Sequence, residues 1–341
     1  MTPALRRLPL FALALAVVAF TGCGKSSQPA GAMVAVGAGG TTAPFKLTFQ
    51  LDWLPEPEHG GFYQAQARGF YREVGLDVDI VPGGLSAAVK EQVVTGRAHV
   101  AQSDSTGTLA WQAEGLPILQ VGAVFQDVPS GLLVSADSGV RGFADLNGKT
   151  IIARPEWPFL KFIQQKYGVT FNVVPQNFSV AAFLAGKEAI QQGYSIAEPY
   201  HIVKAGGKEP RFLSTWDAGF RAYAVLITGK KFAREHPAEL RAFLAASARG
   251  WRDYIEGDPA PAHAALKAAH KDNTDDFMGA SRRLIIEGQL VTGRGADGGP
   301  AQIGRISRER FATQIAQLEA LGVLEKGKIK VDDVMTTDFL P

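Results

Sequence analysis

Two side chains at the ends of predicted elements have the chemistry to bind a planar molecule that carries an amine. Trp53 follows a strand predicted at 46–51, and its indole offers a flat face on which a ring can stack. Glu198 precedes a helix that Pro199 begins, and its carboxylate can accept charge-assisted hydrogen bonds from an amine and a ring N–H. Each has a structural alternative, since Trp53 can be core and Glu198 can be an acid that the helix dipole stabilises by about 0.3–1 kcal/mol.

Further candidates for ligand contact occupy similar positions. Ser103 and Asp104 follow a short predicted strand and lead into a helix, so each can either line a ligand site or cap the helix. Gly83, in a Pro-Gly-Gly turn, permits the backbone to approach a ligand, and His59 can hydrogen-bond a ring nitrogen or remain a solvated loop histidine. The remaining candidates are a second aromatic wall and two phenols: Trp157, Tyr194 and Tyr200.

Composition and missing motifs exclude several classes of protein. The 341-residue chain has 35 Lys+Arg and 33 Asp+Glu, a net charge of +2, which excludes a polybasic nucleic-acid protein. Its single cysteine excludes a disulfide framework and an all-cysteine zinc site. There is no GxSxG, HExxH or phosphate-loop motif, and the four histidines from His201 onward lack ligand spacing. We therefore expect no enzyme activity, metal or cofactor.

The N-terminus indicates export. Arg6 and Arg7 precede an uncharged apolar run at 8–20, which is short of the about 20 residues that span a bilayer and is typical of a secretory signal. The next residues, Phe20-Thr21-Gly22-Cys23, resemble the lipobox of bacterial lipoproteins, in which the cysteine is lipidated; ordinary cleavage with Cys23 as a bystander is the alternative. We predict a signal peptide at 1–22 and a flexible Gly/Ala/Ser/Thr-rich tether at 23–44, on the extracytoplasmic (periplasmic) face. Removing 1–22 leaves a neutral chain, so acyl chains on Cys23 would have to hold it at the membrane.

From residue 45 onward, strand and helix patterns alternate. Alternating or apolar runs predict strands at 46–51, 76–81, 99–102, 117–125, 131–136, 150–153, 171–174, 193–196 and 222–227. Helical patterns are expected at 61–68, 71–74, 87–95, 106–114, 159–167, 180–184, 232–255 and 306–321. Strands that alternate with helices form parallel sheets with ligands at the strand ends, so the fold class is α/β.

A series of short motifs carries a family resemblance. In chain order they are Leu51-Asp52-Trp53-Leu54-Pro55, His59-Gly60-Gly61-Phe62-Tyr63, Gly69-Phe70-Tyr71, Gly75-Leu76-Asp77-Val78, Gly96-Arg97-Ala98-His99-Val100-Ala101, Asp145-Leu146-Asn147-Gly148-Lys149 and Glu198-Pro199-Tyr200. Over about 45–250 the chain resembles type II periplasmic substrate-binding proteins, most closely the branch of thiamine-pyrimidine synthesis and uptake, which is related to the nitrate, sulfonate and taurine binders.

The resemblance implies two lobes with the ligand cleft between them. Lobe 1 would comprise 45–134 and 226–341 and lobe 2 would comprise 135–225, with crossings near Leu133-Val134 and Val225-Leu226. In the related pyrimidine binders a tryptophan in the motif of Trp53 stacks on the ligand. The turn that begins at Arg154 departs from the small Gly/Thr-rich turn of those relatives and implies a differently shaped pocket.

The resemblance also implies the function of a solute receptor. We expect a monomeric lipoprotein that delivers a small heterocycle to the permease of an ABC importer, with a thiamine-related aminopyrimidine as the favoured ligand. A riboflavin-like heterocycle, a sulfonate or nitrate are alternative ligands. Two other classes stay open: a pyrimidine-forming enzyme of the thiamine pathway, whose eukaryotic members add a cysteine-rich iron motif, and a non-transport sensor.

Overall fold

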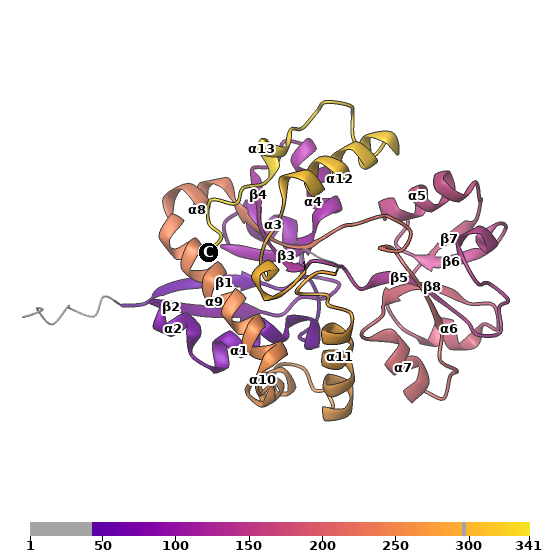
Figure 1. Cartoon of the computed structure of the whole chain (residues 1–341), viewed down its shortest axis with the longest axis horizontal. Coiled ribbons are helices and arrows are strands. Elements are labelled where there is room, and N and C mark those ends of the chain that lie inside the picture. The colour runs from indigo at the N-terminus through magenta and orange to yellow at the C-terminus, as the bar shows by residue number, and fades with distance from the viewer. Residues whose placement is uncertain (1–42, 295–297) are drawn as a thin grey trace, which may run out of the picture. The chain divides into compact units, whose positions relative to one another are not determined.

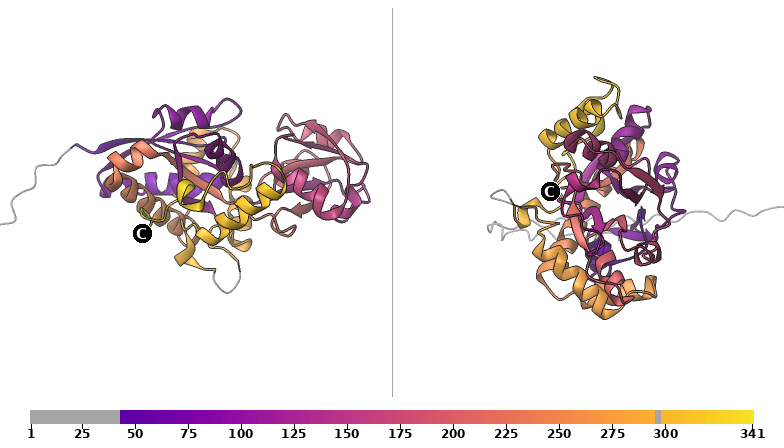
Figure 2. Two further views of the ribbon diagram at one scale, coloured as in Figure 1. Left: turned by 90° about the horizontal axis from the view of Figure 1, so that it is seen from above. Right: turned by 90° about the vertical axis from the view of Figure 1, so that its right-hand side faces the viewer.

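The computed structural model describes residues 43–294 and 298–341, which form two sheets flanked by helices (Figure 1). The predicted signal peptide, Cys23 and all but the last two residues of the predicted tether lie outside the described residues. The first sheet with its helices is lobe 1, and the second sheet with its helices is lobe 2. Figures 1 and 2 show the two sheets next to each other rather than stacked.

The sheet of lobe 1 has the strand order β2-β1-β3-β10-β4. Its strands are β1 (Phe45–Gln50), β2 (Leu76–Val81), β3 (Val100–Asp104), β4 (Ile118–Phe125) and β10 (Ala224–Gly229). β1 pairs in parallel with β2 and β3, whereas β10 runs antiparallel to β3 and β4. Apolar and acidic residues alternate along β2 because successive side chains point to opposite faces of the sheet. Its apolar residues enter the core and its acidic residues face solvent: Leu76, Val78 and Ile80 against Asp77 and Asp79.

The sheet of lobe 2 has the strand order β7-β6-β8-β5-β9. Its strands are β5 (Ser130–Val134), β6 (Thr150–Ala153), β7 (Asn172–Pro175), β8 (Ile190–Tyr194) and β9 (Arg211–Ser214). β6 pairs in parallel with β7 and β8, and β5 pairs antiparallel with β8 and β9. The predicted parallel sheets are therefore mixed sheets, since β5 and β10 run against their neighbours.

The chain crosses between the sheets twice, and both crossings differ from the positions predicted from the sequence. The expected crossing at Leu133-Val134 lies inside β5, which hydrogen-bonds to β8 and β9, so the first crossing is at 126–129. The expected crossing at Val225-Leu226 lies inside β10, so the second crossing is at 215–223. Both expected positions fall in apolar runs, and such runs do not reveal in the sequence which sheet they join.

Helices cover the sheets of both lobes. They are α1 (Gly60–Ala67), α2 (Phe70–Glu73), α3 (Val89–Val94), α4 (Ser105–Ala113), α5 (Pro158–Tyr167), α6 (Ala181–Ala185), α7 (Glu198–Lys204), α8 (Lys230–Glu235), α9 (Pro237–Glu256), α10 (Ala260–Ala269), α11 (Asp275–Glu287), α12 (Arg308–Ala320) and α13 (Val331–Val334), with short 3-10 turns η1 (Pro57–His59), η2 (Phe143–Leu146) and η3 (Pro300–Gln302). The single helix predicted at 232–255 is two helices, because Pro237 has no N–H to continue α8 and instead begins α9.

The contact between α1 and α9 explains the glycine pair of the His59-Gly60-Gly61 motif. A Cβ on Gly61 would lie 2.2 Å from the ring of Trp251, and one on Gly250 would lie 2.3 Å from the carbonyl oxygen of Gly61. Only glycine allows the two backbones to approach this closely. The resulting contact joins the core of lobe 1, in which Phe62 packs at 4.6 Å from Phe49 between ring centroids.

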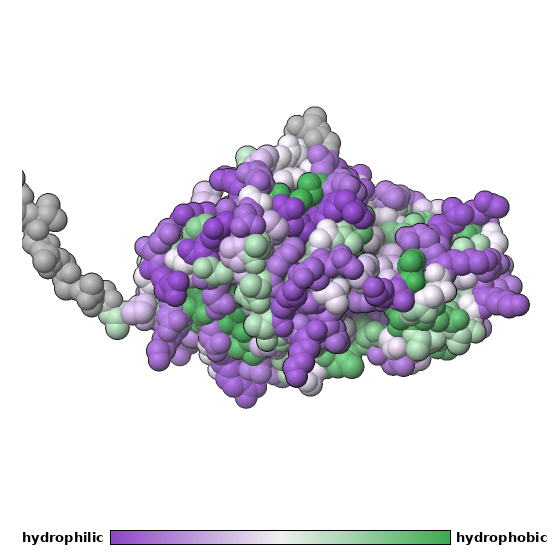
Figure 3. Space-filling model, turned by 90° about the horizontal axis from the view of Figure 1, so that it is seen from below, coloured by the Kyte–Doolittle hydropathy of each residue, from purple (hydrophilic) through white to green (hydrophobic). Residues whose placement is uncertain are grey.

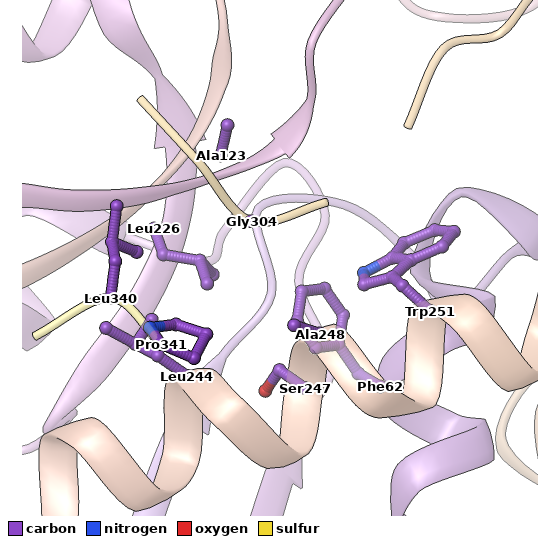
Figure 4. Close-up of a pocket in the computed structure, with 10 residues that line it drawn as sticks. All are labelled: Phe62, Ala123, Leu226, Leu244, Ser247, Ala248, Trp251, Gly304, Leu340 and Pro341. Carbon is purple, nitrogen blue, oxygen red and sulfur yellow. The ribbon is translucent and has the colours of Figure 1, made fainter. Parts of the chain in front are cut away.

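A small cavity lies in lobe 1 between α9 and the C-terminal residues (Figure 4). Its volume is about 10 Å³, and all its lining side chains except Ser247 are apolar. Leu340 and Pro341 close it on one side. A space of this size holds about one water molecule and is too small for an organic ligand.

The surface shown in Figure 3 is mainly hydrophilic, with hydrophobic residues in scattered groups. Of the large apolar side chains in the described part of the chain, Leu85 is the most exposed at 74%. None of the described helices combines the length and the apolar character needed to span a bilayer.

Candidate ligand-binding site

A cavity of about 570 Å³ lies between the two lobes, within the size range of small-molecule sites. From lobe 1 its polar and aromatic lining includes Asp52, Trp53, Glu56, Glu58, Asp104 and Thr106. From lobe 2 it includes Arg154, Glu156, Trp157, Phe178, Tyr194 and Glu198. Five of the residues predicted from the sequence are thus brought together here: Trp53, Asp104, Trp157, Tyr194 and Glu198. The other four, His59, Gly83, Ser103 and Tyr200, do not line the cavity.

Trp53 is held in place by the turn that comes after β2. The N–H of Gly83 donates to the carbonyl oxygen of Trp53 at 2.9 Å, and a Cβ on Gly83 would come within 2.5 Å of the backbone nitrogen of Trp53. Gly83 therefore allows the turn to pack onto the backbone beside Trp53. Its contribution is to position the tryptophan.

Aromatic rings from both lobes meet at this cavity. The centroids of the rings of Trp53 and Phe178 are 5.0 Å apart, and Trp157 packs at 4.8 Å from Phe159 at the start of α5. Phe178 has a φ of 61°, which a bulky side chain rarely adopts and which costs about 1–3 kcal/mol. Phe178 was not a candidate from the sequence, because a lone phenylalanine in a loop carries no pattern.

The charges around the cavity are mostly negative. Its lining contains six carboxylates and, among the described residues, one base, Arg154. The guanidinium of Arg154 donates to the carboxylate of Glu156 at 3.0 Å, so this positive charge is already paired. The other five lining acids have no cation beside them in this lining, which favours a ligand with donors or positive charge.

Three of these acids have pKa values above the ordinary value of a glutamate side chain. Burial, with the nearby charges of Glu198 and Asp272, raises the pKa of Glu56 to about 8. Burial and the charges of Asp52, Glu56 and Glu198 raise the pKa of Glu58 well above its ordinary value. Burial also raises the pKa of Glu198. Like charges close together in a partly dry site resist simultaneous ionisation, and a cation placed among them relieves this repulsion.

Glu198 is bound to the end of β8 by one of its oxygens. The N–H of Tyr194 donates to Oε2 of Glu198 at 2.6 Å. A Cβ on Gly193 would lie 3.1 Å from this carboxyl group, so glycine leaves the room that the contact needs. Glu198 is the first residue of α7 and also lines the cavity. The bond from Tyr194 thus engages Oε2 and leaves Oε1 outside that contact.

Asp104 and Ser103 are bound to the start of α4. The carboxylate of Asp104 accepts from the N–H of Gly107 and the hydroxyl of Thr106, both at 2.7 Å, so Asp104 is the N-cap of the helix. The buried hydroxyl of Ser103 accepts from Thr108 at 3.0 Å. Asp104 lines the cavity while it caps the helix, whereas Ser103 belongs to the interior of lobe 1.

His59 is fully buried behind the cavity wall rather than solvated. Its Nδ1 lies 3.5 Å from the N–H of Glu56, which donates to it, so we assign the proton of the neutral ring to Nε2. Nε2 then donates to Asp52 at 3.4 Å and lies 3.6 Å from Glu58. These three residues have atoms within 4.8 Å of one another, the spacing of a metal site, but coordination through Nε2 would require the opposite tautomer.

Tyr200 contacts lobe 1 outside the cavity. Its ring packs at 5.3 Å from Phe277 of α11, and its hydroxyl lies 3.4 Å from that of Thr274. His201 packs on the same Phe277 at 4.6 Å. Figure 1 shows α7 and α11 on either side of the boundary between the lobes. Tyr200 is therefore placed to support this arrangement of the lobes.

A buried ion-pair cluster joins the two crossings. Asp127, on the first crossing, is 1% exposed at its side chain and lies 3.1 Å from Arg294 and 3.9 Å from Arg310. The guanidinium of Arg310 also donates to the carbonyl oxygens of Arg221 and Ala222 on the second crossing, at 3.0 and 2.9 Å. Burial raises the pKa of Asp127 to about 6, against the opposing effect of the arginines.

Comparisons with known proteins agree with this architecture. The periplasmic aliphatic sulphonate-binding protein SsuA of Escherichia coli superposes with a TM-score of 0.63 at 15% identity, over 86% of this chain and 92% of that one. At that identity the likeness concerns the fold alone. The prediction of an α/β, two-lobed periplasmic-binding-protein fold is confirmed.

Sequence relatives have names that refer to substituted pyrimidines. A 4-amino-5-hydroxymethyl-2-methylpyrimidine phosphate synthase of Saccharomyces cerevisiae is 26% identical over 238 residues, which cover 64% of this chain and 69% of the yeast protein. The formylaminopyrimidine-binding protein of Halalkalibacterium halodurans is 26% identical over 216 residues, with coverage of 60% and 65%. The name of the binding protein, together with the fold, supports a solute-binding role, whereas the name of the yeast relative supports an enzyme. The family model described as NMT1/THI5 like matches residues 56–262, more than half of the sequence, and the chain belongs to this family.

Proposed function

We propose that the protein is the extracytoplasmic solute receptor of an ABC importer and that its ligand is a thiamine-related aminopyrimidine. The observation that carries this proposal is the cavity between the lobes, which combines aromatic walls with five carboxylates that have no lysine or arginine partner in its described lining. An aminopyrimidine offers a flat ring for Trp53 and an amine and ring N–H for Glu198. The name of the formylaminopyrimidine-binding relative supports this class of ligand.

The charges of the cavity argue against the anionic ligands among the alternatives. A sulfonate or nitrate site needs arginine, lysine or free backbone N–H groups. Among the described residues the one lining base, Arg154, is paired with Glu156, and the N–H of Gly107 in the first turn of α4 is already bonded to Asp104. An anion placed among Asp52, Glu58 and Glu198 would be repelled.

Binding would couple the two lobes. Trp53 belongs to lobe 1 and Glu198 belongs to lobe 2, so a ligand that contacts both stabilises the arrangement in which the lobes lie together. The two crossings are the segments about which the lobes would move. A closed, ligand-bound form is what an importer's permease can distinguish from the empty receptor.

The proposed setting rests on the N-terminal sequence. A signal peptide, a lipidated Cys23 and a tether would hold a monomeric receptor at the outer face of the membrane, within reach of the permease. The yeast relatives support a pyrimidine-forming enzyme as the second candidate. The single cysteine of this chain argues against the cysteine-rich iron motif of the eukaryotic enzymes.

The test is a ligand panel on the purified protein. Aminopyrimidines, riboflavin, an alkanesulfonate and nitrate are screened by thermal shift, because a ligand that binds the native state raises the melting temperature. We expect aminopyrimidines to raise it and the two anions to have no effect. Stabilisation by an anion alone would refute the aminopyrimidine assignment. Mass spectrometry after incubation separates receptor from enzyme, since a receptor returns its ligand and its own chain unchanged.

Glu198→Gln examines the central polar contact. The glutamine oxygen can still accept from the N–H of Tyr194, whereas its NH₂ group cannot accept from a ligand amine. We expect the dissociation constant for the pyrimidine to rise about 10- to 150-fold, the value of a charged hydrogen bond. Glu188→Gln, which removes an exposed carboxylate paired with Lys149, is the matched control and should leave affinity unchanged. Equal affinities of both variants would reduce Glu198 to a structural residue.

A further inference from the structure

Glu58 is a buried residue whose carboxyl group lines the cavity and has no hydrogen bond to any other described residue. The residue is 6% exposed and belongs to the cavity lining. In the described part of the chain the nearest basic group is Nε2 of His59 at 3.6 Å, beyond hydrogen-bond distance. A buried polar group without a hydrogen-bond partner destabilises the folded protein. Such a side chain at a cavity wall therefore indicates a ligand group that hydrogen-bonds to it.

The groups around Glu58 supply negative charge rather than a counter-ion. Asp52, Glu56 and Glu198 are the neighbours whose charges act on it, and Asp52 and Glu56 lie on the same loop of lobe 1. His59, the basic side chain that the described residues place beside it, is shared with Asp52 at 3.4 Å. A single amine bound at Glu198 would leave Asp52, Glu56 and Glu58 without a cation on the ligand.

The aromatic rings of the cavity are suited to a positive charge. Trp53 of lobe 1 lies 5.0 Å from Phe178 of lobe 2 between ring centroids, and Trp157 of lobe 2 also lines the cavity. A cation over the face of an aromatic ring is attracted by the negative potential of that face, most strongly over tryptophan. The volume of about 570 Å³ has room for a second group beside a pyrimidine ring.

We propose that Glu58, with Asp52 and Glu56, forms a cation subsite and that the ligand carries a positively charged group in addition to the aminopyrimidine ring. This inference rests on the proposed function, because it adds a subsite to the ring site of Trp53 and Glu198. The chemistry named is an organic cation joined to the ring, which the carboxylates attract and the aromatic faces accept. A neutral aminopyrimidine would fill only part of the site.

The experiment compares two probes that share the ring. 4-Amino-5-hydroxymethyl-2-methylpyrimidine is the neutral probe, and thiamine carries a related aminopyrimidine joined to a permanently charged thiazolium. Isothermal titration of the wild-type protein should show thiamine binding at least about 10-fold more tightly, as expected of one charge-assisted contact. Wild-type affinity for the neutral probe that equals or exceeds that for thiamine would refute the cation subsite and leave the ring site standing. Failure of both probes to bind would instead refute the proposed function.

Glu58→Gln then assigns the preference to this side chain. Glutamine has the same shape and no charge, so we expect thiamine affinity to fall about 10-fold or more while affinity for the neutral probe changes little. Glu56→Gln should act in the same direction, and Glu188→Gln on the outer surface of lobe 2 is the control. A thiamine preference that persists in both cavity variants would show that the cation binds elsewhere. Circular dichroism of each variant confirms that the fold is retained.

Discussion

Replacement of Asp127 by asparagine tests how the charge at the first crossing affects stability. Asp127 is almost fully buried, and neither of its oxygens has a hydrogen-bond partner among the described residues, although Arg294 and Arg310 lie at 3.1 and 3.9 Å. Burial therefore opposes the charged form more than the arginines favour it, which raises the pKa to about 6 from an ordinary 3.8.

The direction of the pH effect is set by that difference. Because the folded protein holds the proton more tightly than the unfolded chain, this residue contributes stability that is present below pH 3.8 and is lost as the pH rises through about 6. At about 1.4 kcal/mol per pKa unit, the loss is about 3 kcal/mol. Asparagine stays neutral at every pH, and Arg310 keeps its bonds to the carbonyl oxygens of Arg221 and Ala222. We therefore expect Asp127→Asn to be more stable than the wild type at pH 8 by up to about 3 kcal/mol, with a smaller advantage at pH 5.

The assay is urea unfolding of both proteins at pH 5 and pH 8. Comparing the variant with the wild type at each pH cancels the effects of Glu56, Glu58 and Glu198, which are unchanged. Asp137→Asn, on an exposed residue paired with Lys208 at 2.8 Å, is the control and should change stability by less than about 1 kcal/mol at either pH. The reasoning is refuted if Asp127→Asn is less stable than the wild type at pH 8 by the about 3–5 kcal/mol typical of a broken buried ion pair.

Two further predictions concern the cavity and the membrane. Trp53→Ala should weaken pyrimidine binding at least about 10-fold, because the stacking surface is lost, and should change the melting temperature of the ligand-free protein little. Titration measures the first effect and thermal unfolding the second. A loss of about 3–5 kcal/mol of stability without ligand would instead show that Trp53 belongs to the core. Cys23→Ser should leave the protein folded but move it from the membrane fraction to the soluble fraction after cell fractionation, and equal retention of both proteins would contradict lipidation.

The architecture was predictable because most of its elements carry strong local patterns. The alternation of β2 and the apolar run of β4 were placed to within one residue. The errors fall where local pattern and tertiary pairing diverge. β9 (Arg211–Ser214) was not predicted, since four residues with two of them polar give no clear alternation, and it is a strand only because it pairs with β5. β8 was predicted at 193–196 but occupies Ile190–Tyr194, because the polar Gln191 and Gln192 conceal a strand that β5 and β6 complete.

The walls of the cavity were harder to predict than the sheets. Trp53 and Glu198 were identified because they stand next to elements with clear patterns. Glu58 was not, because an acid between Pro57 and His59 resembles a solvated loop charge, and its burial depends on how the surrounding loop folds. His59 was placed in the right loop, but its burial behind Asp52 is likewise a property of the fold and not of the motif.

The likeness to a sulphonate-binding protein shows why the fold alone does not determine the ligand. SsuA and this chain superpose over most of their lengths at 15% identity, so one backbone framework can surround differently composed sites. The side chains at the strand ends then determine the sign of the charge that a site attracts. Here those positions place Asp52 after β1 and Asp104 at the end of β3, and the first turn of α4 uses the N–H of Gly107 to bind Asp104. A helix start already neutralised by its own aspartate has little attraction left for an anion, and the same aspartate adds to the negative potential that an amine or an organic cation would meet on entering the cavity.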